Sequence, residues 1–194
     1  MKRLIVALTG ATGSVYGVRL LEALSAIPEI ESHVIVSDAA ALVAQSELGI
    51  GKSEIEKLGQ VVHRAKDIGA SIASGSFKTM GMVIAPCSMK TLASVAHGFS
   101  DDLITRAADV CLKERRRLVL LTREAPLNLA HLRNMVAVTE MGGVIYPPVP
   151  ALYQQNTTID ALVNHAVGRI LDLFEIETTG LVERWNGLAE KQKA

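Results

Sequence analysis

The stretch Leu4-Ile5-Val6-Ala7-Leu8-Thr9-Gly10-Ala11-Thr12-Gly13-Ser14 decides the fold. It opens with a short unbroken apolar run, passes through a turn with two glycines, and continues into apolar residues at helical spacing up to Leu24. An apolar run without alternation is typical of a strand buried on both faces, and the later spacing is typical of an amphipathic helix. The sequence therefore predicts a strand, a tight turn and a helix.

The same order of a short apolar run followed by a helical stretch recurs along the chain. Further strands are predicted over residues 33–36, 82–85, 118–121 and 144–146, and helices up to Glu47 and over residues 88–95, 101–114 and 158–174. Buried strands that alternate with helices form parallel sheets covered on both sides, so we expect a doubly wound α/β fold, Rossmann-like or flavodoxin-like. The length fits a single domain over residues 1–179, followed by a C-terminal arm over 180–194.

Composition and charge argue against several classes of function. Twenty basic side chains balance twenty acidic ones, so no overall field attracts nucleic acid or an anionic membrane. The first apolar run is too short for a signal peptide, and no stretch approaches the roughly 18 apolar residues of a membrane span. Cys87 and Cys111 suggest neither a disulfide framework nor a metal motif. We expect a cytoplasmic protein with no nucleic-acid or membrane partner.

Two strand-to-helix turns could hold an anion, because glycine permits close approach and a helix start offers backbone N–H donors. The first is Thr9–Ser14, whose spacing is not the GxGxxG of dinucleotide sites, so a plain turn with a hydroxyl N-cap is an equally open reading. The second is Pro86–Thr91, in which Ser88 alone would be read as an N-cap. Two such turns at one sheet edge favour a phosphate-bearing cofactor.

Other reactive side chains receive simpler interpretations. Cys87 has no histidine nearby in sequence to activate it, so a buried structural thiol is favoured over a nucleophile. Asp101-Asp102 is interpreted as helix capping, and no second acidic cluster accompanies it, so we expect no metal. The basic run 113–117 is interpreted mostly as a solvated helix end. Arg123 follows a buried strand, where its charge needs either Glu124 or a ligand anion as partner.

Nine segments, in order along the chain, together resemble the UbiX/Pad family of flavin prenyltransferases. The resemblance runs from residue 3 to about residue 185, and no single segment carries it alone. The segments are Gly10–Gly13, Val36–Ala40, Ala73–Ser76, Ala85–Ser88, Arg106–Val110, Leu112–Arg116, Arg123–Pro126, Pro147–Tyr153 and Gly168–Asp172.

The resemblance implies an enzyme that joins the dimethylallyl group of dimethylallyl phosphate to N5 and C6 of reduced FMN without a metal. It also implies a homo-oligomer, a trimer-based dodecamer, that supplies prenylated FMN to a UbiD-type decarboxylase of aromatic or phenolic acids. The implied FMN contacts are Gly10, Ala11, Thr12, Ser37, Ser88, Met89, Lys90, Thr91 and Arg123. The implied substrate contacts are Tyr153, Arg169, Ala73, Ser74, Arg106 and Trp185, and the implied catalytic residues are Glu47, Lys113 and Glu124.

The sequence departs from the family pattern at Thr12, where serine is usual, and at Leu152, where phenylalanine is usual. Both hydroxyl residues can donate a hydrogen bond, so we expect FMN binding to survive the first change. One alternative is an FMN-dependent cysteine decarboxylase. That class relies on a catalytic histidine near the first helix and on an asparagine in the flavin loop, and the corresponding stretches Ser14–Gly17 and Pro86–Met89 fit neither. A second alternative is a non-catalytic FMN carrier, which would not need a separate site for a substrate anion.

Overall fold

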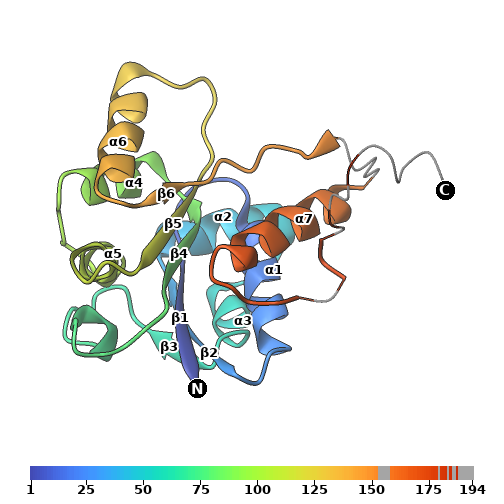
Figure 1. The fold of residues 1–194 in the computed structure, drawn as a ribbon, viewed down its shortest axis with the longest axis horizontal. Helices are drawn as coiled ribbons and strands as arrows, with labels where there is room; N and C mark the ends of the chain where they lie inside the picture. Colours follow the sequence, from blue (N-terminus) through green and yellow to red (C-terminus); the bar gives the residue numbers. More distant parts are fainter. Residues whose placement is uncertain (153–157, 179, 183, 185–186, 188–194) are drawn as a thin grey trace. The chain divides into compact units, whose positions relative to one another are not determined.

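The computed structural model describes residues 1–152, 158–178, 180–182, 184 and 187. The chain divides into two compact units, Met1–Pro148 and Val149–Ala194. The first unit contains the whole β-sheet (Figure 1). The boundary predicted at residue 180 stays a prediction.

The sheet consists of parallel strands in the order β3-β2-β1-β4-β5-β6, which confirms the predicted doubly wound fold. The order reverses between β1 and β4, and in open α/β sheets the crevice beyond such a reversal is where ligands bind. The strands are β1 (Lys2–Leu8), β2 (Ile30–Val36), β3 (Val61–His63), β4 (Gly81–Cys87), β5 (Arg117–Thr122) and β6 (Val144–Ile145).

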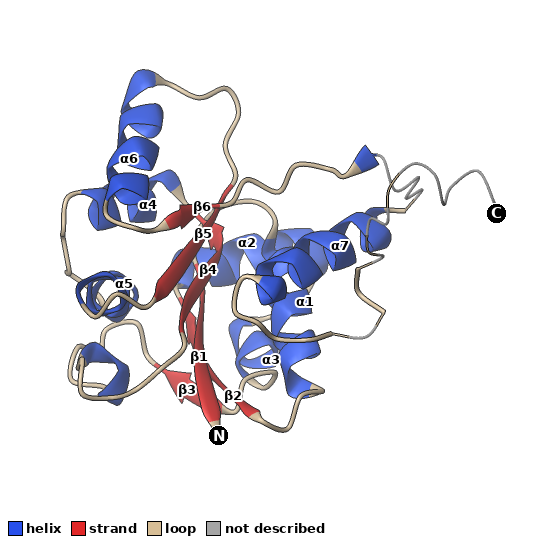
Figure 2. Ribbon diagram, in the orientation of Figure 1, coloured by secondary structure: helices blue, strands red, loops and turns tan. Residues whose placement is uncertain are grey.

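Helices cover both faces of the sheet (Figure 2). Helices α1 and α3 pack on one face, α4 and α5 pack on the other, and α2 packs against α1 while α6 packs against α4. None of the described helices is long and apolar enough to cross a lipid bilayer. The helices are α1 (Ser14–Ser25), α2 (Asp38–Leu48), α3 (Lys52–Glu56), α4 (Met89–Ala96), α5 (Leu103–Lys113), α6 (Leu129–Glu140) and, in the second unit, α7 (Ile159–Asp172), with a 3-10 turn η1 (Ser71–Ala73).

The central strands read as unbroken apolar runs because helices bury them from both sides. All seven residues of β4 are buried, and so are the last five of β1, β2 and β5. This burial is the main source of stability, at roughly 25 cal/mol for each Å² of apolar surface removed from water.

Three elements were not predicted from the sequence. Strand β3 has only three residues, none of them fully buried, and α3 has five. Helix α6 buries Val138 alone, and Leu129, Leu132 and Val136 stay exposed, so its pattern contains no apolar stripe directed at a core. Strand β3 lies at the edge of the sheet and α6 in an outer layer, where burial leaves little trace in the sequence, and α3 is too short to show helical spacing.

Gly17 allows α1 to lie directly on the sheet. A Cβ atom at this position would be 2.2 Å from the carbonyl oxygen of Ala85 and 2.7 Å from Cγ of Leu8. The first of these atoms belongs to the backbone of β4 and cannot rotate away. Glycine at residue 17 is therefore a packing requirement, even though glycine is a poor helix former.

We predict that Gly17→Ala destabilises the protein by about 1–3 kcal/mol, because the clash outweighs the helix-propensity gain of about 1 kcal/mol. Urea denaturation would measure the free energy of unfolding. Gly69→Ala is the control, since the nearest atom to its Cβ is Asp67 Oδ1 at an ordinary 3.5 Å. A Gly17→Ala variant as stable as the wild type would contradict the close packing of α1.

Candidate active site

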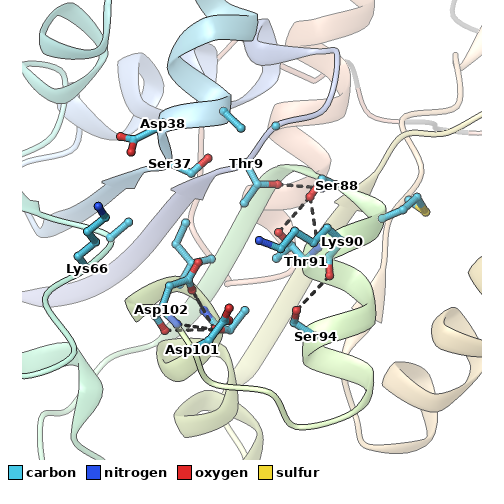
Figure 3. Close-up of a pocket in the computed structure, with 16 residues that line it drawn as sticks. Thr9, Ser37, Asp38, Lys66, Ser88, Lys90, Thr91, Ser94, Asp101 and Asp102 are labelled. Carbon is cyan, nitrogen blue, oxygen red and sulfur yellow. Dashed lines mark hydrogen bonds between the residues drawn. The ribbon is translucent and has the colours of Figure 1, made fainter.

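A pocket of about 620 Å³ opens at the carboxyl edge of the sheet, around the point where the strand order reverses. Its volume lies within the range of about 300–1,000 Å³ that is usual for small-molecule sites. Figure 3 shows polar side chains from several elements facing the same space. The lining residues are Thr9, Gly10, Ser37, Asp38, Ala39, Ala65, Lys66, Ser88, Met89, Lys90, Thr91, Ser94, Asp101, Asp102, Ile104 and Thr105.

The hydroxyl of Thr9 joins the two strands that flank the reversal. Thr9 Oγ1 donates to the carbonyl oxygen of Pro86 at 2.9 Å and accepts from the backbone N–H of Ser88 at 2.8 Å. The Thr9 N–H donates to the same Pro86 carbonyl at 3.1 Å, and the residue is only 3% exposed. These contacts fix the starts of the β1–α1 and β4–α4 loops relative to each other.

Three helices begin at this pocket, and each has a side-chain cap. Ser37 accepts from the N–H of Ala40 at the start of α2, Ser88 from that of Thr91 at the start of α4, and Asp102 from that of Thr105 at the start of α5. The positive ends of three helix dipoles therefore converge on one space, an arrangement that stabilises a bound anion. The capping role predicted for Ser88 is confirmed, and in the Asp101-Asp102 pair it is confirmed for Asp102.

Six of the nine FMN contacts implied by the resemblance line this pocket: Gly10, Ser37, Ser88, Met89, Lys90 and Thr91. Ala11, Thr12 and Arg123 are not among the described lining residues. Lys66, which follows β3, was not predicted as a site residue, yet it lies across the pocket from Lys90 (Figure 3). It could not be found because β3 itself was not predicted.

Glu47, at the end of α2, caps the start of α1. Its carboxylate accepts the N–H groups of Gly13, at 3.0 and 3.1 Å, and Ser14, at 2.9 Å, together with the hydroxyl of Thr12. Helix α1 begins after Gly13, whose φ of 102° favours glycine, and no side chain at this N-cap position supplies a hydrogen bond. The donors expected to bind a ligand anion are thus engaged by a carboxylate of the same chain.

The environment of Glu47 keeps it ionised. Burial alone would raise the pKa of Glu47, but the hydrogen bonds from Thr12, Ser14 and Gly13 outweigh burial and hold that pKa below its ordinary value.

Arg123 and Glu124 follow β5 at the same sheet edge. Arg123 is close enough to Tyr16 of α1 for its charge to lower the Tyr16 pKa, although burial has the larger effect and raises it. Glu124 Oε1 accepts the backbone N–H of Ala125 at 3.0 Å, so its carboxylate folds back onto its own loop. Both side chains are exposed.

Four other predicted site residues lie in the first unit but do not line the described pocket: Ala73, Ser74, Arg106 and Lys113. Lys113 Nζ pairs with Glu114 at 2.6 Å and would be 2.8 Å from a Cβ on Gly75, in the loop that precedes β4. Arg106 Nε donates to the carbonyl of Ala73 at 3.2 Å and its Nη1 to Asp109 at 2.7 Å. Helix α5 begins at the pocket and ends at Lys113, eleven residues or about 16 Å further on. The chain does not bring these residues to the described pocket.

Arg116 belongs to the basic run 113–117, which was interpreted mostly as a solvated helix end, but its side chain is mostly shielded from solvent. Its side chain is 14% exposed, and it donates to the carbonyls of Gly75 at 2.5 Å and Phe77 at 2.7 Å. It therefore fastens the loop that precedes β4. The local pattern of basic residues gave no sign of this contact because the loop lies about 40 residues earlier.

In the second unit, Arg169 of α7 pairs with Asp172 at 2.5 Å. Tyr153 and Trp185, the other two substrate residues implied for this part of the chain, lie outside the described residues.

Both cysteines are buried and free. Burial raises the pKa of the Cys111 thiol to about 12 and that of Cys87 further still, which confirms the structural interpretation of Cys87. Among the described residues, no three His, Cys, Asp or Glu side chains are grouped as metal ligands would be.

Comparison with known proteins shows the family to which the chain belongs. The family described as Flavoprotein matches residues 1–171. The flavin prenyltransferase UbiX of Neisseria meningitidis is 55% identical over 190 residues, covering 98% of this chain and all of the relative. The chain belongs to the UbiX family of flavin prenyltransferases.

Two solved UbiX-family structures have the same fold. AnUbiX (PadA1), in complex with FMN and dimethylallyl pyrophosphate, superposes with a TM-score of 0.93 at 49% identity, covering 96% of this chain and 98% of that one. A dodecameric FMN-dependent UbiX-like decarboxylase from Escherichia coli O157:H7 also gives 0.93, at 45% identity, covering 95% of this chain and all of that one. The family predicted from nine short segments is confirmed.

The Glu47 contacts predict a pH dependence of stability. Because the folded pKa lies below the unfolded value of about 4.3, the carboxylate stabilises the fold above that pH and loses its contribution as pH falls through the folded pKa. We predict that Glu47→Gln is less stable than the wild type at pH 7 and that the difference shrinks below about pH 4.

Urea denaturation at a series of pH values would measure this difference. Glu22→Gln is the control, because Glu22 contacts Arg19 on an exposed part of α1 and caps no helix. A constant difference between wild type and Glu47→Gln across the acid range would contradict the proposed capping by an ionised carboxylate.

Proposed function

We propose that this chain transfers the dimethylallyl group of dimethylallyl phosphate to reduced FMN, and that the prenylated FMN passes to a UbiD-type decarboxylase. The observation that carries the proposal is the convergence of three capped helix starts on a pocket at the strand-order reversal. It is supported by the UbiX relatives and by the FMN and dimethylallyl pyrophosphate in the AnUbiX complex. We also propose a cytoplasmic location, which the two buried, free cysteines fit.

The pocket fits a flavin mononucleotide. Helix starts at Ser37 and Ser88 supply N–H donors and hydroxyls for a phosphate, and Lys66 and Lys90 supply positive charge on facing walls. When bound, reduced FMN supplies the electron-rich N5 and C6 atoms that form the new carbon bonds. The remaining implied contacts, Ala11, Thr12 and Arg123, come from the two loops that adjoin this pocket.

The cations assist departure of the phosphate. Breaking an allylic C–O bond leaves a phosphate with charge near −2, so groups that bind it more strongly as it departs speed the reaction. Arg169 and Tyr153 hold the ester in this proposal, and Lys113 and Arg106 stabilise the leaving group where a metal would otherwise do so. Ala73, Ser74 and Trp185 complete the walls of the substrate site.

Glu47 and Glu124 are the candidate proton carriers. Ring closure at C6 requires loss of a proton, and Glu47 is ionised at neutral pH and therefore able to accept one. Its lowered pKa makes it a weak base, so the proton would pass on readily. Thr12, which donates to Glu47, orients this carboxylate in the same role that the serine usual in the family would have.

The site needs more than one copy of the chain. Lys113 lies at the far end of α5, about a helix length from the pocket of its own chain, so it joins a substrate site at that pocket only if a neighbouring copy presents it. The dodecameric relative from E. coli O157:H7 supports assembly of this kind. A trimer-based dodecamer is the assembly that we propose.

We predict that purified protein, given reduced FMN and dimethylallyl phosphate without added metal, yields a flavin heavier by one C5H8 unit. Mass spectrometry of the extracted flavin would detect it. Arg169→Ala should retain FMN and lose about 10²–10³-fold in rate, by analogy with the loss of one preorganised donor. An unchanged flavin mass with the wild type would favour the non-catalytic carrier instead.

Ser37→Ala is predicted to weaken FMN binding about tenfold or more, because a hydroxyl facing the phosphate is lost, and to destabilise α2 by about 1 kcal/mol. Asn128→Ala is the matched control: Asn128 caps α6 in the same way, accepting from His131 N–H at 2.9 Å, but does not line the described pocket. Flavin titration and urea denaturation separate the two effects. Equal FMN affinity in both variants would exclude Ser37 from the flavin site.

Two inactive variants should restore activity when mixed. If Arg169 comes from one copy and Lys113 from another, co-assembly of equal amounts of Arg169→Ala and Lys113→Ala chains leaves about a quarter of the sites intact. Co-expression with two affinity tags would isolate the mixed particles. Absence of any recovery in mixed particles would show that one copy supplies both cations.

A further inference from the structure

Two arginines share one carboxylate in the second unit. Arg184 donates from Nη1 to Oδ2 of Asp172 at 2.6 Å and from Nη2 to Oδ1 at 2.7 Å, while Arg169 donates from Nη1 to Oδ2 at 2.5 Å. The Asp172 side chain is 15% exposed, whereas those of Arg169 and Arg184 are 47% and 54% exposed. A sheltered carboxylate thus holds two guanidinium groups that remain open to solvent.

The two contacts are not equivalent. Arg184 occupies both oxygens of Asp172 in a bidentate pair, which is the stronger and more directional arrangement. Within the described residues, Arg169 is held at one nitrogen only, and its other N–H groups are not used in this contact. The three side chains sum to a formal charge of +1, and the charge of Glu177 acts on Arg184, so among the described residues the unpaired positive charge lies at Arg169.

Arg184 reaches Asp172 because Leu181 and Val182 lie against α7 at Gly168. Val182 Cγ2 is 2.2 Å from the position that a Cβ on Gly168 would take, so only glycine leaves room for this contact. Gly168 and Asp172 are four residues apart and share one helix face. The contacts of Val182 and Arg184 therefore hold these two residues against the face of α7 that carries Gly168 and Asp172.

Without Arg184, both oxygens of Asp172 would be open to Arg169, which lies three residues earlier on the same helix. A bidentate Arg169–Asp172 pair would occupy the two parallel N–H groups of the guanidinium that a phosphate needs. It would also neutralise the charge of Arg169. Arg184 prevents this by holding the carboxylate itself.

We propose that Arg184 is a positioning residue for the substrate site: by occupying Asp172, it leaves the guanidinium of Arg169 oriented and available for the phosphate monoester. The inference rests on the proposed function, which gives that ester to Arg169. It assigns to Arg184 a role in substrate affinity.

The test is binding of dimethylallyl phosphate, measured by calorimetry, to protein that contains oxidised FMN and so cannot turn over. We expect Arg184→Gln to weaken binding about tenfold, the loss expected when Asp172 sequesters the Arg169 fork. The double variant Arg184→Gln with Asp172→Asn should bind within about threefold of the wild type, because the competing carboxylate is gone. Arg184→Lys should fall between the two, since lysine cannot form the bidentate pair.

A merely structural role for Arg184 gives a different pattern, because removing Asp172 as well would loosen the segment no less. Arg184→Gln with wild-type affinity, or a double variant as weak as Arg184→Gln, would overturn the proposal. Arg19→Gln, which removes an arginine–carboxylate contact to Glu22 in α1, should bind like the wild type. FMN content and melting temperature confirm that each variant is folded.

The proposed function is judged separately, by the mass of the flavin after reaction with reduced FMN. Tight binding of the ester with the predicted variant pattern but no prenylated flavin would refute the transfer reaction and uphold the role of Arg184. Prenyl transfer by the wild type with no effect of Arg184→Gln on ester binding would uphold the transfer reaction and refute the role of Arg184. Failure of the wild type to bind the ester would overturn the inference.

Discussion

The contacts of the Thr9 hydroxyl are the constraint on which the site depends. A buried hydroxyl that donates to Pro86 and accepts from Ser88 leaves neither of its partners unsatisfied, and it links two loops that are 77 residues apart. Because α4 begins at Ser88, the same contact sets where that helix starts and aims its N-terminus at the pocket. The reversal of strand order makes this the place where two helices can diverge to opposite faces and leave a crevice between them.

Helix starts at this edge are satisfied in two distinct ways. Helices α2, α4 and α5 have caps of their own, and their remaining N–H groups and dipoles are available to a ligand. Helix α1 lacks such a cap and instead receives Glu47 from α2. A carboxylate placed there stabilises the helix and at the same time keeps a negative, exposed group beside the Thr12 loop. Capping of α1 by Glu47 is therefore compatible with the proton acceptance that we propose for it.

The sequence predicted well what depends on neighbours along the chain. Unbroken apolar runs predicted the β1, β2, β4 and β5 strands because two-sided burial leaves a direct record in composition, and the turns at Gly10 and Ser88 predicted the pocket edge. It did not predict Glu47 as a cap or Arg116 as a clamp, since their partners lie about 35 and 40 residues away. Family resemblance supplied Lys113, but its distance from the pocket follows from the length of α5, which no motif records.

The cations proposed to meet the substrate share an electrostatic design. Lys113 pairs with Glu114, Arg106 with Asp109 and Arg169 with Asp172, each with a carboxylate one or three residues further along the chain. These pairs are partly exposed, so each contributes little to stability on its own. Their value lies in orientation: a neighbouring carboxylate limits the rotamers of a long side chain and lowers the entropy lost when a phosphate arrives. A phosphate dianion can bind such a pair by contacting the side of the cation that the carboxylate leaves uncovered. The net gain is therefore largest where the carboxylate is itself held by a third group, as Asp172 is by Arg184.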